Sequence, residues 1–430
     1  MRRAHALPPL LLLLIAGLAP FARAQDLVTR EEAVRLALER SPDAVGARGA
    51  TRVAEAGLLE ARGAWLPSLS ATSIYSNSSN ERFDQSTGQL VSESYAAQLQ
   101  ASYELFTGGR KIASWQAASA SLRAAEARER GQRYDTILET TLVFYQAAAA
   151  DELLVAARQR LERATRQQEF AETRRLVGTA TRSDALRAEL EKADAELAVV
   201  DAEAQLRTAR LSLGRQIGRP GAVRPAPGAL PEEPPVVPPI ETLVERAEAN
   251  APDAVAARAE LDRARSAKLQ AWTQYSPSLR LTGGYDWFSF QWPPDEESWS
   301  LRLTASLPIF NGFAREGQVA RAEADRRTAE AEARDAALLS RALVEDAAGQ
   351  IATAARRVEI AARALTLARE DLRVIEERYQ LGAATIVDLQ TSQVALADAE
   401  VGWVRARQDL GVAVAALEAE LGEPLAEIGA

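Results

Sequence analysis

The chain has 430 residues, a formal net charge of −9 at pH 7, no cysteine, one histidine (His5) and one methionine (Met1). This composition excludes a disulfide framework, a lipid-anchored amino-terminal cysteine, a thiolate nucleophile and metal sites built on imidazole or thiolate ligands. The acidic balance argues against a nucleic-acid partner. We therefore expect no catalytic residues, no metal site and no cofactor.

The first 24 residues predict a signal peptide. Arg2 and Arg3 precede the apolar run LPPLLLLLIAGLA, and Ala22-Arg23-Ala24 fits an A-x-A cleavage site. A transmembrane anchor is the alternative, but the run is shorter than the roughly 20 residues that a membrane-spanning helix needs. We expect Gln25 to be the first mature residue, and losing three arginines would change the net charge from −9 to −12.

An internal repeat covers nearly the whole mature chain. SPDAV at 41–45 recurs as APDAV at 251–255, and PSL at 67–69 recurs at 277–279. Later matches share another offset: Phe106 with Phe310, Gly178 with Gly382, Asp184 with Asp388, and Gly218 with Gly422. These constant offsets predict a first repeat at 25–217, a proline-rich linker at 218–239 that is neither helix nor inner strand, and a second repeat at 240–430.

Each repeat is expected to begin with a short helix and a longer one. The ranges are about 29–40 and 42–65 in the first repeat, and about 240–249 and 252–275 in the second, where a proline ends the helical pattern. Two extended segments follow, at about 68–105 and 277–309. Apolar Tyr95, Ala97 and Leu99 alternate there with polar residues such as Gln98 and Gln100. A period of two with one apolar face predicts half-buried strands.

The apolar face of these strands has two possible environments. Strands of about ten residues are long enough to cross a bilayer when tilted, and aromatic residues flank the loops expected at 76–92 and 290–297. The alternative is a small soluble sheet that packs on a helix. A membrane barrel must close and rarely has fewer than eight strands. Because one chain offers only four, several chains would have to share one barrel.

After Gly108 and Gly312 a helical pattern runs for about seventy residues, which corresponds to about 100 Å. Apolar residues seven positions apart mark the second of these helices and the helix that follows it. They are Val344, Ile351, Val358, Leu365, Leu372 and Tyr379, followed by Leu389, Leu396, Trp403, Leu410 and Leu417. A sustained heptad pattern predicts long coiled-coil helices that pack knobs into holes.

Two similar stretches interrupt the long helices, RLVGTATRSDALRAEL at 175–190 and YQLGAATIVDLQTSQVAL at 379–396. We expect Gly178 and Gly382 to end one helix in the left-handed conformation, with a threonine or serine as N-cap of the next. Asp184 and Asp388 would then lie in the first turn, where a carboxylate complements the helix dipole. The two helical tips are thus predicted at about 176–184 and 380–388.

The two-copy organisation, the paired strands and the glycine–aspartate turns resemble the outer-membrane efflux proteins, the TolC-like family, over residues 26–424. The most specific parts are Leu176-Val177-Gly178-Thr179 with Asp184, and Tyr379-x-Leu381-Gly382 with Asp388. The resemblance implies a mixed α and transmembrane β fold. It also implies a homotrimer with a 12-strand outer-membrane β-barrel on a 12-helix periplasmic α-barrel.

The same resemblance implies a function in the outer membrane and periplasm. The chain would form the exit duct of a tripartite efflux or type I secretion system and export substrates passively. Its partners would be outer-membrane lipid, a periplasmic adaptor protein and, through that adaptor, an inner-membrane pump or ABC transporter. The transported substrate and the identity of the adaptor do not follow from the sequence.

The resemblance also implies roles for residues at the tips. Asp388 would line the periplasmic gate as a ring of three carboxylates, and Asp184 and Tyr379 would provide polar links that close it. The adaptor-docking turns would comprise Leu176, Gly178, Thr179, Leu381, Gly382 and Ala383. Thr391 and Ala384 stand where members of this family carry an aspartate and a basic residue, so we expect a gate with weaker charge and fewer closing links.

Two functions of other classes stay open on the sequence. A soluble trimeric periplasmic coiled-coil scaffold would be extracted without detergent, whereas a duct would require detergent. A carboxylate hydrolase on a helical frame would lose activity when an acid is changed to an amide. The sequence places no acid pair in a cleft-like context, which argues against the hydrolase.

Overall fold

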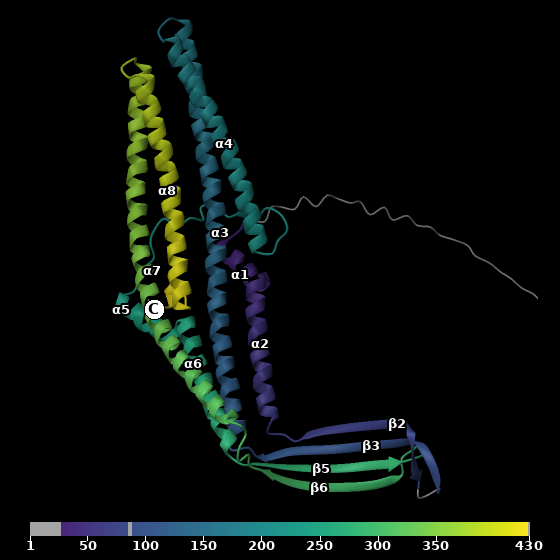
Figure 1. Ribbon diagram of the computed structural model, residues 1–430. Helices are drawn as coiled ribbons and strands as arrows, with labels where there is room; N and C mark the ends of the chain where they lie inside the picture. Colours follow the sequence, from purple (N-terminus) through teal and green to yellow (C-terminus); the bar gives the residue numbers. More distant parts are fainter. Residues whose placement is uncertain (1–26, 85–87, 429–430) are drawn as a thin grey trace, which may run out of the picture.

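The computed structural model describes residues 27–84 and 88–428. The expected signal peptide and Gln25 lie outside these described residues. Figure 1 shows a long array of helices with a four-stranded sheet extending from one end. At the other end of the array lie the turns of two helical hairpins.

The first repeat contains four helices and two long strands, besides the short strand β1 (Leu27–Val28). They are α1 (Arg30–Arg40), α2 (Pro42–Gly63), β2 (Ser68–Asp84), β3 (Gln89–Phe106), α3 (Arg110–Leu176) and α4 (Arg182–Gln216). Two side chains start the first helices: the Thr29 hydroxyl accepts from Glu32 N–H, and the Ser41 hydroxyl accepts from Ala44 N–H. Capping of this kind satisfies donors that have no partner within the helix.

The second repeat has the same order of elements. They are α5 (Ile240–Asn250), α6 (Pro252–Trp272), the 3-10 turn η1 (Thr273–Tyr275), β5 (Ser278–Ser289), β6 (Glu296–Ser306), α7 (Ala314–Gln380), α8 (Ile386–Leu421) and α9 (Leu425–Ile428). The long helices α3 and α7 each contain 67 residues. This length agrees with the run of about seventy expected from the sequence.

The proline-rich linker lies against the helices. Its short strand β4 (Arg224–Pro225) pairs in parallel with β1 (Leu27–Val28). The buried guanidinium of Arg407 in α8 binds the linker through Leu230 O (2.8 Å) and binds Glu152 of α3 (2.9 Å). Burial raises the pKa of Glu152, although the adjacent arginine opposes the shift. The linker is therefore held to helices of both repeats.

The four long strands form one antiparallel sheet in the order β2-β3-β5-β6. In its register Leu99 opposes Ala71 on one side and Tyr285 on the other, and Tyr285 opposes Trp299. Because paired residues point to the same side of a sheet, the apolar positions of all four strands share one face. The predicted alternation is therefore continuous across both repeats.

The first β-hairpin, formed by β2 and β3, is longer than the sequence pattern indicated. Strand β2 continues to Asp84 and β3 begins at Gln89, so most of the loop expected at 76–92 belongs to the two strands. The register shifts between Asn77 and Arg82. Polar residues obscure the alternation here, whereas backbone pairing continues regardless of side-chain polarity. In the second hairpin the difference is small, because β6 begins at Glu296, inside the loop expected at 290–297.

The four longest helices lie side by side in the order α4-α3-α8-α7 (Figure 1). The predicted heptad positions of α7 are buried, from Val344 to Tyr379. The predicted heptad positions of α8 are also buried, except that Trp403 is partly exposed. A second cluster joins Phe144 and Tyr145 of α3 to Leu213 of α4 and to Val404 of α8. The core is thus a series of apolar seams between neighbouring helices.

Candidate functional site

The two helical turns at the end of the array farthest from the sheet form the candidate site (Figure 1). The first tip joins α3 to α4 across residues 177–181, and the second joins α7 to α8 across residues 381–385. All of the site residues expected from the sequence lie at these two tips. The structure thus brings together residues about 200 positions apart in the chain.

The same backbone motif ends α3 and α7. Gly178 and Gly382 have φ values of 80° and 77°, in the left-handed region that glycine adopts without strain. The N–H of Thr179 donates to Arg174 O at 2.9 Å, and the N–H of Ala383 donates to Arg378 O at 2.8 Å. These are the bonds of a Schellman motif, which satisfies the final carbonyls of a helix. The prediction that both glycines end a helix in the left-handed conformation is confirmed.

A reciprocal capping box starts each returning helix. The Thr181 hydroxyl accepts from Asp184 N–H at 3.1 Å, and the Asp184 carboxylate accepts from Thr181 N–H at 2.9 Å. Thr385 and Asp388 make the equivalent bonds at 3.2 and 2.8 Å. Such a box satisfies two helix-start donors at once. Hydrogen bonds from the threonine hold the pKa of both aspartates below the ordinary value.

The residues expected to dock an adaptor lie at the outer surface of the tips. Leu176 and Leu381 are 72% and 84% exposed, and Gly178, Thr179, Gly382 and Ala383 are exposed as well. Each tip therefore offers one exposed leucine on a glycine-containing turn.

Tyr379 differs from the other site residues because it is buried. Its ring packs at 5.9 Å from Phe170 of α3, in an edge-on arrangement. Burial raises the pKa of its phenol, whereas the charge of nearby Arg174 opposes the shift. Asp184 is near enough to affect this pKa, but the hydrogen bonds described for its carboxylate go to Thr181. Tyr379 therefore packs the contact between the two hairpins.

Sequence reasoning missed the residues that connect the hairpins. Arg174 of α3 lies over the ring of Tyr379 and donates to its carbonyl oxygen at 3.2 Å. The amide of Gln390 in α8 donates to Arg187 O in α4 at 3.1 Å. The only signal was a basic residue in the last turn of a helix, which ordinarily indicates an interaction with that helix's own dipole.

The sheet contributes a second surface, at the opposite end of the molecule. Trp299, Leu301 and Leu303 of β6 are 76%, 67% and 60% exposed, and Leu69 and Tyr75 of β2 are exposed on the same face. On the other face Glu104 forms ion pairs with Arg280 at 2.9 Å and with Arg110 at 2.7 Å. The sheet therefore separates an apolar face from a charged one.

None of the described helices is long and apolar enough to cross a membrane.

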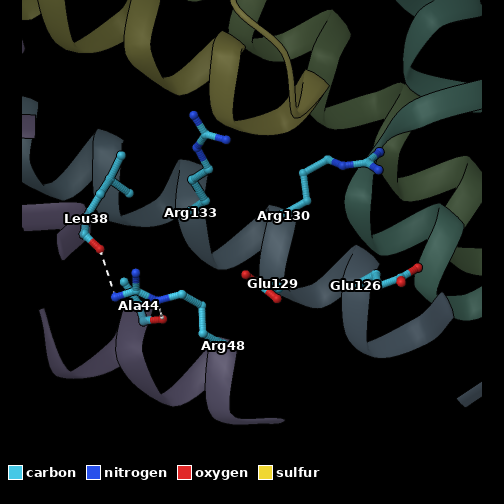
Figure 2. A pocket seen from close by; sticks show the side chains of 7 residues that line it. All are labelled: Leu38, Ala44, Arg48, Glu126, Glu129, Arg130 and Arg133. Carbon is cyan, nitrogen blue, oxygen red and sulfur yellow. Dashed lines mark hydrogen bonds between the residues drawn. The ribbon is translucent and has the colours of Figure 1, made fainter. Parts of the chain in front are cut away.

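Cavities also lie between the helices of the array. One of about 420 Å³ lies between α2 and α3 and is lined by arginines and glutamates (Figure 2). Arg48 of α2 donates there to Leu38 O of α1 and to Ala44 O of its own helix. Within residues 27–84 and 88–428, no group of three or more acidic or histidine side chains is placed to hold a metal ion.

Comparison with known proteins supports one family. A family model described as outer membrane efflux protein matches residues 33–219 and 243–423, which together make up most of the chain. No sequence among the curated proteins compared matches the chain.

Solved structures share the fold. The outer membrane protein VceC from Vibrio cholerae aligns with a TM-score of 0.77 and 19% identity, over 92% of this chain and 96% of that one. The open state of the Neisseria gonorrhoeae MtrE outer membrane channel aligns with a TM-score of 0.78 and 22% identity, over 92% and 89%. A membrane protein from Pseudomonas aeruginosa aligns with a TM-score of 0.79 and 22% identity, over 92% and 90%.

Proposed function

The chain belongs to the outer membrane efflux protein family, and from this premise we propose that it is the exit duct of a tripartite efflux or type I secretion system. The family consists of channels and not of enzymes. The duct would span the outer membrane and the periplasm and would let substrates pass without catalysis, with energy supplied by a partner. The observation that carries this proposal is the single apolar face that runs across all four strands.

The apolar face of the sheet supports contact with outer-membrane lipid. Among the described residues, no helix covers Trp299, Leu301 or Leu303, as their exposure indicates. Four strands cannot close a barrel, and an open edge in a bilayer would leave backbone groups without hydrogen bonds. Three chains would supply twelve strands, and the edge strands of neighbouring chains would then hydrogen-bond to each other. The charged face, with Glu104 and Arg280, would then line the water-filled interior.

The edges of the helical layer support a trimer. On α7, which is one edge, a second heptad row is exposed: Ile360, Leu367, Val374 and Leu381. On α4, which is the other edge, a matching row is exposed: Leu186, Leu190, Leu197 and Val200. Apolar rows with coiled-coil spacing require a partner helix. In the proposed trimer α7 of one chain packs on α4 of the next, and twelve long helices close into a periplasmic tunnel.

The tips support the position of the gate and of the adaptor contact. Asp388 is exposed beside the second turn, so three copies would form a ring of carboxylates at the periplasmic entrance. Such a ring favours cations over anions through its field. Asp184 and Tyr379 would lie next to this ring, and the exposed leucines Leu176 and Leu381 would dock the adaptor, through which an inner-membrane pump or ABC transporter is reached.

Single-channel conductance in a planar bilayer tests the proposal. We expect the detergent-purified protein to form a small, cation-preferring channel whose selectivity falls in Asp388→Asn, a change that removes the charge but keeps an acceptor for the capping bonds. Asp398→Ala removes the same charge from an exposed position farther along α8 and is the matched control. A folded protein that needs no detergent and forms no channel would favour the soluble trimeric scaffold instead.

A further inference from the structure

We propose that Arg174 holds the two hairpin tips of one chain together, as an intrachain bridge that keeps the entrance narrow. The bridge consists of Arg174 with Phe170, from α3, and Tyr379, from α7, and is called the Arg174 bridge below. Its effect on the entrance depends on the proposed duct function, whereas the contact itself does not. Tyr379 is one of the gate residues that the resemblance implies, but its partner in this contact, Arg174, is not.

The guanidinium of Arg174 is enclosed by two rings. Its central carbon lies 5.7 Å from the centre of the Phe170 ring and 5.5 Å from the centre of the Tyr379 ring. The rings themselves are 5.9 Å apart. A planar cation within about 6 Å of an aromatic ring is attracted by the ring's negative face, more strongly when water is partly excluded. Arg174 is half-buried and Tyr379 is 5% exposed, so the contact is sheltered.

Arg174 also binds the end of the opposite helix. Its Nη1 donates to Tyr379 O at 3.2 Å, and the same carbonyl accepts from Gly382 N–H at 3.1 Å. The last carbonyls of a helix lack intrahelical donors and carry the negative end of its dipole, so a cation is stabilised there. A side chain from the first helical hairpin (α3 and α4) therefore caps the carboxyl end of α7 in the second (α7 and α8). Lysine lacks the planar group that stacks and donates at the same time.

Other contacts between the hairpins at this end are sparse. In the apolar cluster at the tips, the first hairpin contributes Ala171, Ala188 and Phe170, whereas the second contributes large residues such as Leu372 and Leu389. Nearer the tips the other described links between α3–α4 and α7–α8 are polar, namely Gln390 to Arg187 O and Arg163 with Glu400 at 3.6 Å. The pair of Arg407 with Glu152 and the apolar contacts of Tyr145 lie farther along the helices. Small side chains bury little area, so the Arg174 bridge supplies a large share of the attraction between the tips.

The adjacent arginine offers a matched control. Arg175 pairs with Glu172 of its own helix at 2.6 Å, and the contacts described for its side chain do not reach the second hairpin. Arg175→Ala removes the same charge from the same turn of α3. Any effect of Arg174→Ala that is absent in Arg175→Ala therefore belongs to the bridge and not to the local charge.

Distance measurement between the tips tests the bridge directly. The chain contains no cysteine, so Ser183→Cys and Gln380→Cys give one spin label on each tip. Full-length protein in detergent, with labelled chains diluted into unlabelled ones, reports the intrachain distance. We expect Arg174→Ala to lengthen and broaden this distance, with a shift of about tenfold towards separated tips, the equivalent of about 1.4 kcal/mol. Arg175→Ala should leave the distribution unchanged.

A distance distribution that does not change in Arg174→Ala would overturn the bridge. If that variant does not fold, Arg174→Lys keeps the charge and Phe170→Leu keeps the apolar volume, and each should give a smaller shift in the same direction. Unchanged distances in both variants would also overturn it. Conductance of the same proteins separates the bridge from the proposed function. Wider tips without a larger conductance would support the bridge but count against a gate at the tips.

Discussion

Tyr145 of α3 lies so close to Gly411 of α8 that a Cβ atom on the glycine would be 2.3 Å from the Cε2 atom of the tyrosine. Glycine is therefore required at this position because helix packing leaves no space for a side chain, and not because of the backbone conformation. The contact joins a helix of the first repeat to one of the second. It lies where the apolar clusters of both repeats approach each other.

Gly411→Ala should destabilise the protein by about 1–3 kcal/mol, because an added methyl group forces the helices apart. Gly402 of the same helix has no atom within 4 Å of the point where a Cβ would lie, so Gly402→Ala is the control. There the change should be neutral or should stabilise α8 by about 0.5–1 kcal/mol. Thermal unfolding of the two detergent-purified variants distinguishes these outcomes, and equal effects would contradict the packing argument.

Loss of the second capping box should loosen the start of α8. Thr385→Ala removes the hydroxyl that accepts from Asp388 N–H, which costs about 1 kcal/mol of local stability. Hydrogen exchange of the amides at 386–390 should become faster. Thr391→Ala is the control, since its hydroxyl donates to Val387 O within the helix and caps nothing. Equal exchange in the two variants would show that the box does not stabilise the tip.

The same box should make the tip sensitive to acid. Its hydrogen bonds hold the pKa of Asp388 below the ordinary value near 3.8. A carboxylate with a depressed folded pKa stabilises the fold above the unfolded pKa, and this contribution is lost as the pH falls through the folded value. The protection of the amides at 386–390, relative to their intrinsic exchange rate at each pH, should therefore fall below about pH 4. In Asp388→Asn this loss of protection should be weaker, and an identical pH profile of protection would contradict the assignment.

A charge on the exposed heptad row of α7 should prevent assembly without unfolding the chain. Leu367→Glu places a carboxylate where we expect the neighbouring α4, and burying it there would be unfavourable. Thr366→Glu adds the same charge at an adjacent exposed position that points elsewhere on the helix. Native mass spectrometry in detergent should show monomers for Leu367→Glu and trimers for Thr366→Glu. Trimers in both would place the subunit contact elsewhere.

Two neighbouring residues of β6 should differ in whether a charge there prevents membrane insertion, because they lie on opposite faces of the sheet. Leu301→Arg introduces a cation on the apolar face, at a cost of about 2–4 kcal/mol near the middle of a bilayer. Ser300→Arg introduces it on the polar face, beside the existing Arg302. Insertion into lipid vesicles, measured by flotation, should fail only for Leu301→Arg. Equal insertion would favour a sheet that does not contact lipid.

Local patterns in the sequence were sufficient for much of the fold. Heptad spacing identified the buried residues of α7, such as Ile351 and Leu365, because a helix presents every third or fourth residue to one side. Gly178 and Gly382 marked the helix ends, because the left-handed conformation strongly favours glycine. A threonine or serine was expected as N-cap of each returning helix, and Thr181 and Thr385 have this role. Helix ends and caps both depend on residues within one turn of each other.

Contacts between distant residues required the tertiary structure. Arg174 and Tyr379 are 205 positions apart, and no local pattern indicates that one caps the helix of the other. Neither the clash that excludes a side chain at Gly411 nor the extension of β2 to Asp84 follows from composition or periodicity. The sequence by itself determined most of the helices, strands and turns, because those depend largely on short-range sterics and hydrogen bonds. Only the tertiary structure decided which of these segments touch, because packing depends on the shape of both partners.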